Sequence, residues 1–177
     1  MLMLKLSEYL GRLSGNAVED AALIRSLALE QNINPYDVAS VLESMLVLVD
    51  INPQATLIAD LGKNTGTGTG VCRWSENLFG VVLTDRDSRL ASYYMGQWAY
   101  VTAQINAGNF YTAIGRIQFT GDAAATYAKE FEGHYLLPSD VLHVVAESIK
   151  NPVQLRDKFP TVPLRVLRNR LAEEDLL

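Results

Sequence analysis

Apolar residues near the N-terminus recur at intervals of three and four, the spacing of a helix that buries one face. A first helix is predicted to end near Gly15, with an apolar face of Leu2, Leu6, Tyr9, Leu10 and Leu13. Asn16 is typical of an N-cap, because its side-chain oxygen can accept a hydrogen bond from the amide of Glu19. A second helix is therefore expected from Asn16 to about Glu30, with a buried stripe of Val18, Ala22, Leu23 and Leu27.

The tripeptide Ile-Asn-Pro occurs at 33–35 and again at 51–53. Each copy places an asparagine cap before a proline, which suits the first helical position because its missing amide proton is not needed there. Both copies therefore predict helix starts, and the second helix should run to Gly62. The first helix is expected to be central, because it is apolar around much of its circumference: Val38, Val41, Leu42, Met45, Leu46 and Val49.

Glycine and threonine alternate from Thr65 to Gly70, which predicts a loop because glycine is costly in a helix. The following stretch, 71–83, favours extended structure, and one short hairpin is expected there at most. The longest helix should come next, capped by a side chain in 84–87 and ended by Gly108. Its candidate caps are Thr84, Asp85 and Asp87, and its core stripe is Leu90, Tyr94, Trp98, Val101 and Ile105. Tyr93 and Tyr100 lie off the stripe and are freer to serve a groove.

The last third of the chain predicts four helices, separated by glycine and proline. The first covers 121–132 and closes at Gly133, the second covers 138–149, and the others begin at Pro152 and after Pro163. The final helix changes from basic (Arg165, Arg168, Arg170) to acidic (Glu173, Glu174, Asp175). This order opposes the helix macrodipole, so we expect the helix to contact another subunit or the body of the domain.

Composition fits one domain of 177 residues, 49% of them hydrophobic. We divide it into an N-terminal helical scaffold (1–50), a groove-bearing core (54–149) and C-terminal helices (152–177). A formal charge of −5 argues against nucleic acid as a partner, and one cysteine with two histidines offers no zinc site. We expect no metal, no cofactor, no membrane span and no signal peptide, which places the protein in the cytoplasm when it is made.

Among the carboxylates near the glycine run, Glu76 is the best candidate for acid chemistry. The others are Asp60, Asp85 and Asp87. Apolar neighbours surround Glu76 in the sequence, namely Trp74, Leu78 and Phe79. Such an environment raises the pKa of a carboxyl group and suits it to protonate a glycosidic oxygen.

Three segments resemble, in order and approximate spacing, the catalytic core of the family 19 chitinases and their phage-endolysin relatives, within the lysozyme-like group. They are the sequence of 54–66, then Glu76-Asn77-Leu78, then the tract from Tyr111 to Gly121. In the last, the residues that match the family are Tyr111, Gly115, Ile117, Gln118, Thr120 and Gly121. The resemblance, which covers about residues 54–127, implies a mainly helical, lysozyme-like α+β fold that acts on peptidoglycan or a chitin-like glycan.

The resemblance also implies roles for individual residues. Glu76 takes the place of the family's second carboxylate and is the catalytic candidate, whereas the substrate-binding candidates are Gln118, Thr120, Tyr111 and Asn64. This chain departs from the family at its catalytic acid, which is Asn64 here, at the preceding histidine, which is Lys63, and at two arginines of the third motif. Asparagine cannot donate a proton as a general acid, so Glu76 would act alone.

Three interpretations follow. The first is a murein hydrolase, in which Glu76 serves as the single acid, as one glutamate does in lytic transglycosylases with a Gly-x-x-Gln segment like 115–118. The second is a non-catalytic descendant, either a saccharide-binding module or a structural component of a phage particle, associated with the virion through its C-terminal helix or assembled as a homo-oligomer. The third is an unrelated helical protein that matches by chance.

Overall fold

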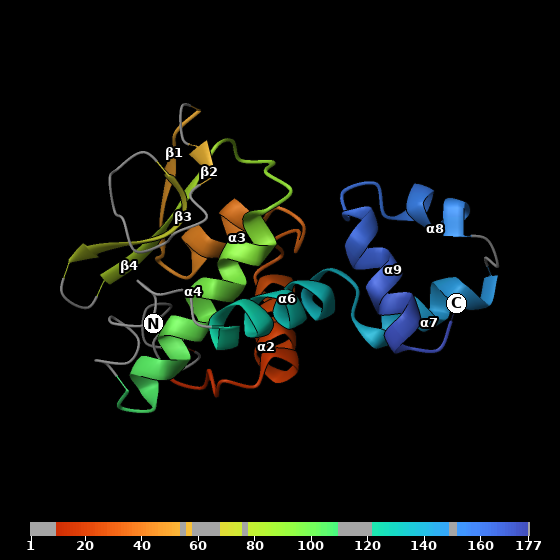
Figure 1. Cartoon of the computed structure of the whole chain (residues 1–177), viewed down its shortest axis with the longest axis horizontal. Helices are drawn as coiled ribbons and strands as arrows, with labels where there is room; N and C mark the ends of the chain where they lie inside the picture. The colour runs from red at the N-terminus through yellow and green to blue at the C-terminus, as the bar shows by residue number, and fades with distance from the viewer. Residues whose placement is uncertain are drawn as a thin grey trace.

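The computed structural model describes residues 10–53, 56–57, 68–75, 78–109, 122–148 and 152–176. Within these ranges the chain is mainly helical, as predicted. Helices α2 (Ala17–Glu30), α3 (Val38–Ser44), α4 (Ala91–Asn106) and α6 (Asp122–Leu136) form a body beside a small sheet (Figure 1). Helices α7 (Ser139–Ser148), α8 (Pro152–Lys158) and α9 (Leu164–Glu173) form a second group at the C-terminal end of α6 (Figure 1). The predicted first helix lies largely outside the described residues.

Helix α2 begins where the sequence predicts, because Asn16 Oδ1 accepts hydrogen bonds of 3.1 Å from the amides of Val18 and Glu19. The predicted buried stripe is wrong in part: Leu27 is buried as expected, whereas Val18 and Ala22 are exposed. The side that is buried consists of Ala17, Asp20, Ala21, Ile24, Leu27 and Ala28. Small residues on this side allow α2 to pack closely against α6.

Helix α3 is shorter than predicted and does not begin at the proline. Residues 34–37 form a turn, and the carboxylate of Asp37 caps the helix by accepting a 3.2 Å hydrogen bond from the amide of Ser40. The helix ends in a Schellman motif, in which the amide of Val47 donates to the carbonyl of Leu42 at 3.0 Å. Between them Leu46 has a φ of +59°, so the chain leaves the helix there and the predicted helical stretch to Val49 is a strand instead.

The sheet is larger than the single hairpin that the sequence predicts. Strands β3 (Gly68–Ser75) and β4 (Leu78–Leu83) form that hairpin antiparallel to each other. The predicted loop of 65–70 is wrong at its end, because β3 already begins at Gly68. Strand β1 (Leu48–Ile51) adds parallel to β4, and β2 (Thr56–Leu57) adds parallel to β3, giving the order β1-β4-β3-β2.

The predicted helix from Pro53 is therefore wrong where the structure describes it. The amide of Asn52 donates a 2.8 Å hydrogen bond to the carbonyl of Leu83, so the pairing of β1 with β4 continues to the residue before the proline. Asn52 prolongs a strand instead of capping a helix, and β2 follows at Thr56–Leu57. The rest of the predicted helix, 58–62, lies outside the described residues.

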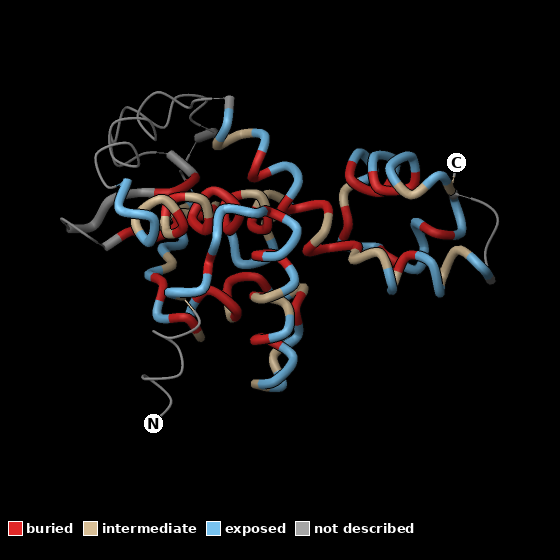
Figure 2. Tube along the Cα trace, turned by 90° about the horizontal axis from the view of Figure 1, so that it is seen from below, coloured by how far each residue is buried: buried red, intermediate tan, exposed pale blue. Residues whose placement is uncertain are grey.

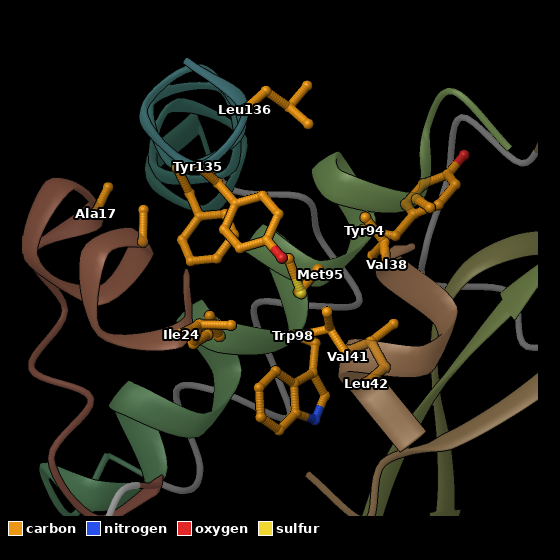
Figure 3. Close-up of a cluster of buried hydrophobic side chains, with 14 of the residues drawn as sticks. Ala17, Ile24, Val38, Val41, Leu42, Tyr94, Met95, Trp98, Tyr135 and Leu136 are labelled. Carbon is orange, nitrogen blue, oxygen red and sulfur yellow. The ribbon is translucent and has the colours of Figure 1, made fainter. Parts of the chain in front are cut away.

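Helix α4 carries the predicted core stripe, and Gly108, with a φ of +78°, ends it as expected. Tyr94, Trp98 and Val101 are buried, and Figure 3 shows the first two beside residues of α3 in the main apolar cluster. The predicted caps are wrong, because no side chain caps the first turn of α4. The start of the helix is instead preceded by a turn in which the amide of Ala91 donates to the carbonyl of Ser88 at 3.0 Å.

Helix α6 runs past Gly133, where the sequence predicts its end. Gly133 serves close packing instead: a Cβ at this position would lie 3.1 Å from Cδ of Arg170, a residue of α9. The predicted starts of α7, α8 and α9 are confirmed. Buried residues line the inward sides of these helices as well as the body (Figure 2). No helix among the described residues is long and apolar enough to cross a membrane.

Candidate functional site

The five residues that the sequence assigns to the site lie outside the described residues: Glu76, Asn64, Tyr111, Gln118 and Thr120. The elements that flank them are described. β3 ends at Ser75 and β4 begins at Leu78, and these two residues are partners in the ladder, so Glu76 falls in sequence between two paired strands. The tract 111–121 falls in sequence between α4 and α6. That Glu76 and Gln118 face one cleft stays a prediction.

Helix α4 contacts the other three elements that flank these segments. It packs against β3 and β4 and also against α6. Its approach to α6 is close because Gly96 has no side chain: a Cβ there would lie 3.0 Å from Cδ1 of Phe131. The second motif is thus flanked by two strands that pack against α4. The third motif is flanked by α4 itself and by α6, which packs against α4.

One side of α4 carries Tyr93, Gln97 and Tyr100, because positions i, i+4 and i+7 are neighbours on a helix. This side is nearly opposite Met95, which lies in the buried cluster with Ile24 (Figure 3). Tyr93 and Tyr100 are half-buried. Their rings contact those of Tyr94 and Tyr127, with centroids 5.8 and 5.4 Å apart. Gln97 is buried and both tyrosines pack against the hydrophobic core, so this side of α4 is not an open face.

A cavity of about 70 Å³ lies at the start of α4, between the body and the C-terminal helices. Its lining includes Arg86, Ser88, Arg89, Ser92 and Thr161. Arg86 is already engaged, because its guanidinium donates hydrogen bonds of 2.8 and 2.9 Å to the two carboxylate oxygens of Glu43. These bonds lower the pKa of Glu43. Sites for drug-sized ligands have volumes of roughly 300–1,000 Å³, so this cavity is too small for a glycan strand.

A buried ion pair joins α6 to α9 beside this cavity. Glu132 is 0% exposed and accepts hydrogen bonds of 2.7 and 3.1 Å from the guanidinium of Arg165. Burial raises the pKa of Glu132, and the hydrogen bonds from Arg165 and Ser92 oppose that rise. A carboxylate that is enclosed and paired in this way holds two helices together and is not available as a catalytic acid.

Arg170 is the centre of a second polar cluster in the C-terminal helices. Its side chain is buried and donates to the carbonyl of Leu137 at 3.0 Å, to Glu173 at 2.7 Å and to Glu174 at 2.7 Å. Ser139 Oγ donates to the same Glu174 carboxylate. The predicted contact of α9 with the body of the protein is thus present, through Arg165 and Arg170. A contact with another subunit stays a prediction.

Sequence reasoning did not identify the buried charges Asp20, Glu132 and Arg170. A signal was present for the first, since Asp20 stands between Ala17, Ala21 and Ile24 at helical spacing. Its carboxylate accepts hydrogen bonds from the amides of Ser14 and Gly15, at 2.8 and 3.0 Å. These are structural roles, so the three motif segments remain the candidate site.

Comparison of the chain with protein-family models, with curated proteins and with solved structures gives no match. In the part of the chain that the structure describes, no three histidine, cysteine, aspartate or glutamate side chains are grouped as ligands for a metal ion. The candidate site therefore depends on the residues and elements described above.

Proposed function

We propose that the chain is a murein hydrolase-like protein, a glycosidase of the lysozyme-like group that acts on peptidoglycan glycan strands. The observation that carries this proposal is the ordered set of three motifs, 54–66, 76–78 and 111–121, with Glu76 and Gln118 retained. The fold supports it in one respect. The strands on either side of Glu76 pack against α4, and Gln118 falls in sequence between α4 and α6, which pack against each other.

The chemistry would centre on the carboxyl group of Glu76. In its protonated form Glu76 donates its proton to the glycosidic oxygen as the bond to the anomeric carbon breaks. The resulting carboxylate then takes a proton from the nucleophile that attacks the oxocarbenium-like carbon, which restores the acid. Gln118, Thr120 and Tyr111 would hold the sugar, and no metal ion takes part.

A second candidate function has one specific observation in its favour: Asn64 stands where the family has its acid. A protein that keeps the groove and lacks proton transfer would bind the glycan without cleaving it. It would then serve as a saccharide-binding module or as a structural component of a phage particle.

Turnover of purified peptidoglycan separates these functions. Glu76→Gln keeps the shape of the side chain and removes the proton, so turnover should fall by about 10²–10⁴-fold with folding unchanged. Glu147→Gln, an exposed position on α7, is the matched control and should leave turnover intact. Asn64→Glu restores the family's acid and should raise activity.

Three other outcomes are informative. Turnover by Glu76→Gln equal to that of the wild type would contradict the assignment of the acid. Binding of peptidoglycan without cleavage, with activity gained in Asn64→Glu, would favour the non-catalytic descendant. Wild-type protein that neither binds nor cleaves peptidoglycan or chitin oligomers, with Asn64→Glu equally inert, would contradict both saccharide functions and favour a structural or unrelated helical protein.

A further inference from the structure

The cavity at the start of α4 has a lining of described residues that combines an apolar wall with charges of both signs. The apolar wall consists of Val38, Ala91 and Leu136, and the first and last of these are labelled in Figure 3. The polar lining comes from the loop before α4, from Tyr36, and from Thr161, which lies between α8 and α9. A few polar groups that converge on an apolar wall from separate segments can fix the orientation of a small ligand.

Two of the polar lining residues are held in place by hydrogen bonds. The hydroxyl of Tyr36 donates to the carbonyl of Leu136 at 3.0 Å, which joins two walls of the cavity. The guanidinium of Arg86 is fixed by its two hydrogen bonds to Glu43. These walls are formed before a ligand arrives, which lowers the entropy cost of binding.

Asp87 and Arg89 are the lining residues whose charges are free to meet a ligand. Both are exposed, and among the described residues neither side chain forms an ion pair or a hydrogen bond. The charge of Arg86 is balanced by Glu43. Asp87 and Arg89 balance each other in the same way, so a ligand with a net charge of either sign gains little here. A ligand with one carboxylate and one ammonium group would meet a partner for each.

We propose that this cavity binds a small zwitterion, namely a free α-amino acid with a short side chain. Its carboxylate would bind to Arg89 at the N-terminal end of α4, where no side chain caps the first turn and the backbone amides favour negative charge. Its ammonium group would bind to Asp87, and its side chain would lie against Val38 and Leu136. A cavity of about 70 Å³ holds roughly five to seven water-sized groups of about 10–15 Å³ each, which matches glycine or alanine. This site does not depend on the proposed glycosidase function.

Binding of glycine and of L-alanine to the whole chain, measured by NMR titration, tests this site. The backbone amide signals of Ala91 and Thr161 should shift, because both residues line the cavity. Acetate supplies the carboxylate alone and methylamine the ammonium group alone. Each should therefore bind more weakly than either amino acid, by roughly tenfold or more, because a hydrogen bond to a charged group is lost.

Substitution of the two free charges tests their roles separately. Arg89→Gln and Asp87→Asn each remove one charge and keep a polar side chain, so each should weaken glycine binding by roughly tenfold. Both positions are exposed, so the melting temperature without ligand should change little. The matched controls, Arg156→Gln and Asp157→Asn, make the same exchanges at exposed positions of α8 outside the lining and should bind glycine like the wild type.

Any of three results would overturn the site. Wild-type protein that binds neither amino acid would show that the cavity takes no zwitterion. Acetate or inorganic phosphate that binds as tightly as glycine would show that the cavity recognises an anion alone. Glycine binding that is unchanged in Arg89→Gln and Asp87→Asn would place the amino acid elsewhere on the molecule. Turnover of peptidoglycan tests the glycosidase separately and is unaffected by these results.

Discussion

The hydroxyl of Tyr127 donates a 2.6 Å hydrogen bond to Oδ2 of Asp20, joining α6 to α2 inside the protein. The same carboxylate holds the backbone of Ser14 and Gly15, so one buried charge fixes the entry to α2 and its contact with α6. Its donors come from both sides, which compensates for taking the carboxylate out of water.

Removing one of these donors should destabilise the protein. Tyr127→Phe removes one hydrogen-bond donor from the Asp20 carboxylate. A hydrogen bond to a charged group contributes about 1.5–3 kcal/mol to the free energy of unfolding, so a loss of this size is expected. Tyr36→Phe is the control, because the Tyr36 hydroxyl donates at 3.0 Å to a neutral carbonyl, that of Leu136, and should cost about 0.5–1.5 kcal/mol. Urea denaturation gives both free energies of unfolding. Equal losses of stability in the two variants would mean that the charge of Asp20 does not strengthen its hydrogen bond with Tyr127.

A glycine in place of Leu46, at the end of α3, should stabilise the protein. Leu46 has a φ of +59° and is 58% exposed, so Leu46→Gly relieves the steric cost of this conformation and loses little packing. The free energy of unfolding should rise by about 0.5–1 kcal/mol. Leu29→Gly, with Leu29 56% exposed inside α2, should lower it by a similar amount, because helical glycine is unfavourable. Destabilisation by both changes would refute the assigned backbone conformation of Leu46.

The ion pair between Glu132 and Arg165 should behave as a buried carboxylate with an exposed partner. Arg165→Met leaves Glu132 without its guanidinium, and a loss of about 2–4 kcal/mol is expected at pH 7, given that Arg165 is half exposed. The pKa of Glu132 is raised in the folded state, so the native protein takes up a proton more readily than the unfolded chain. The loss should therefore shrink as the pH falls toward 4.5, the ordinary pKa of the group.

A double substitution tests the source of this loss. Glu132→Gln in the Arg165→Met background removes the unpaired charge, so it should restore part of the stability at pH 7. The stability that Arg165→Met alone regains as the pH falls should then be absent from the double variant. A double-mutant cycle of denaturation measurements gives the coupling free energy. A coupling of zero would show that the two side chains act independently.

Glu174 should show the opposite pH dependence. Hydrogen bonds from Ser139, Arg170 and His143 lower its pKa from 4.5 to about 2. The stability that Glu174 contributes is complete above pH 4.5, the pKa of the group in the unfolded chain, and disappears as the pH falls from 4.5 through 2. Glu174→Gln should therefore reduce stability at pH 7 and flatten the pH profile in this window, measured by denaturation from pH 7 to 2. An unchanged profile would mean that other carboxylates account for all the acid sensitivity.

Local signals in the sequence predict some of the helix boundaries, because cap and stop residues act over three or four positions. Asn16, Gly108 and Pro163 all mark ends that the structure confirms. The same reasoning fails at Asn52, whose amide is taken by Leu83 in a parallel strand far along the chain. No periodicity within 48–57 indicates that partner, and the sheet was underestimated for this reason.

The candidate site was predictable to a different degree. The three motifs can be read from the sequence, whereas the cavity at the start of α4 becomes evident only when the fold is known. Glu132 shows the same limit: a glutamate between Phe131 and Gly133 gives no sign that Arg165 will cover it. Pairs of charges brought together by helix packing depend on the tertiary structure, which a local pattern does not encode.

The packing of α2 against α6 sets an order for folding during synthesis. Arg25 of α2 donates a 2.8 Å hydrogen bond to the carbonyl of Tyr135, and the apolar side of α2 is covered by residues that the ribosome adds much later. Until α6 has emerged, α2 has no such partner, so the body of the protein can close only late in translation. A nascent chain stalled between 110 and 120 should therefore expose this side and be a good substrate for chaperones and proteases.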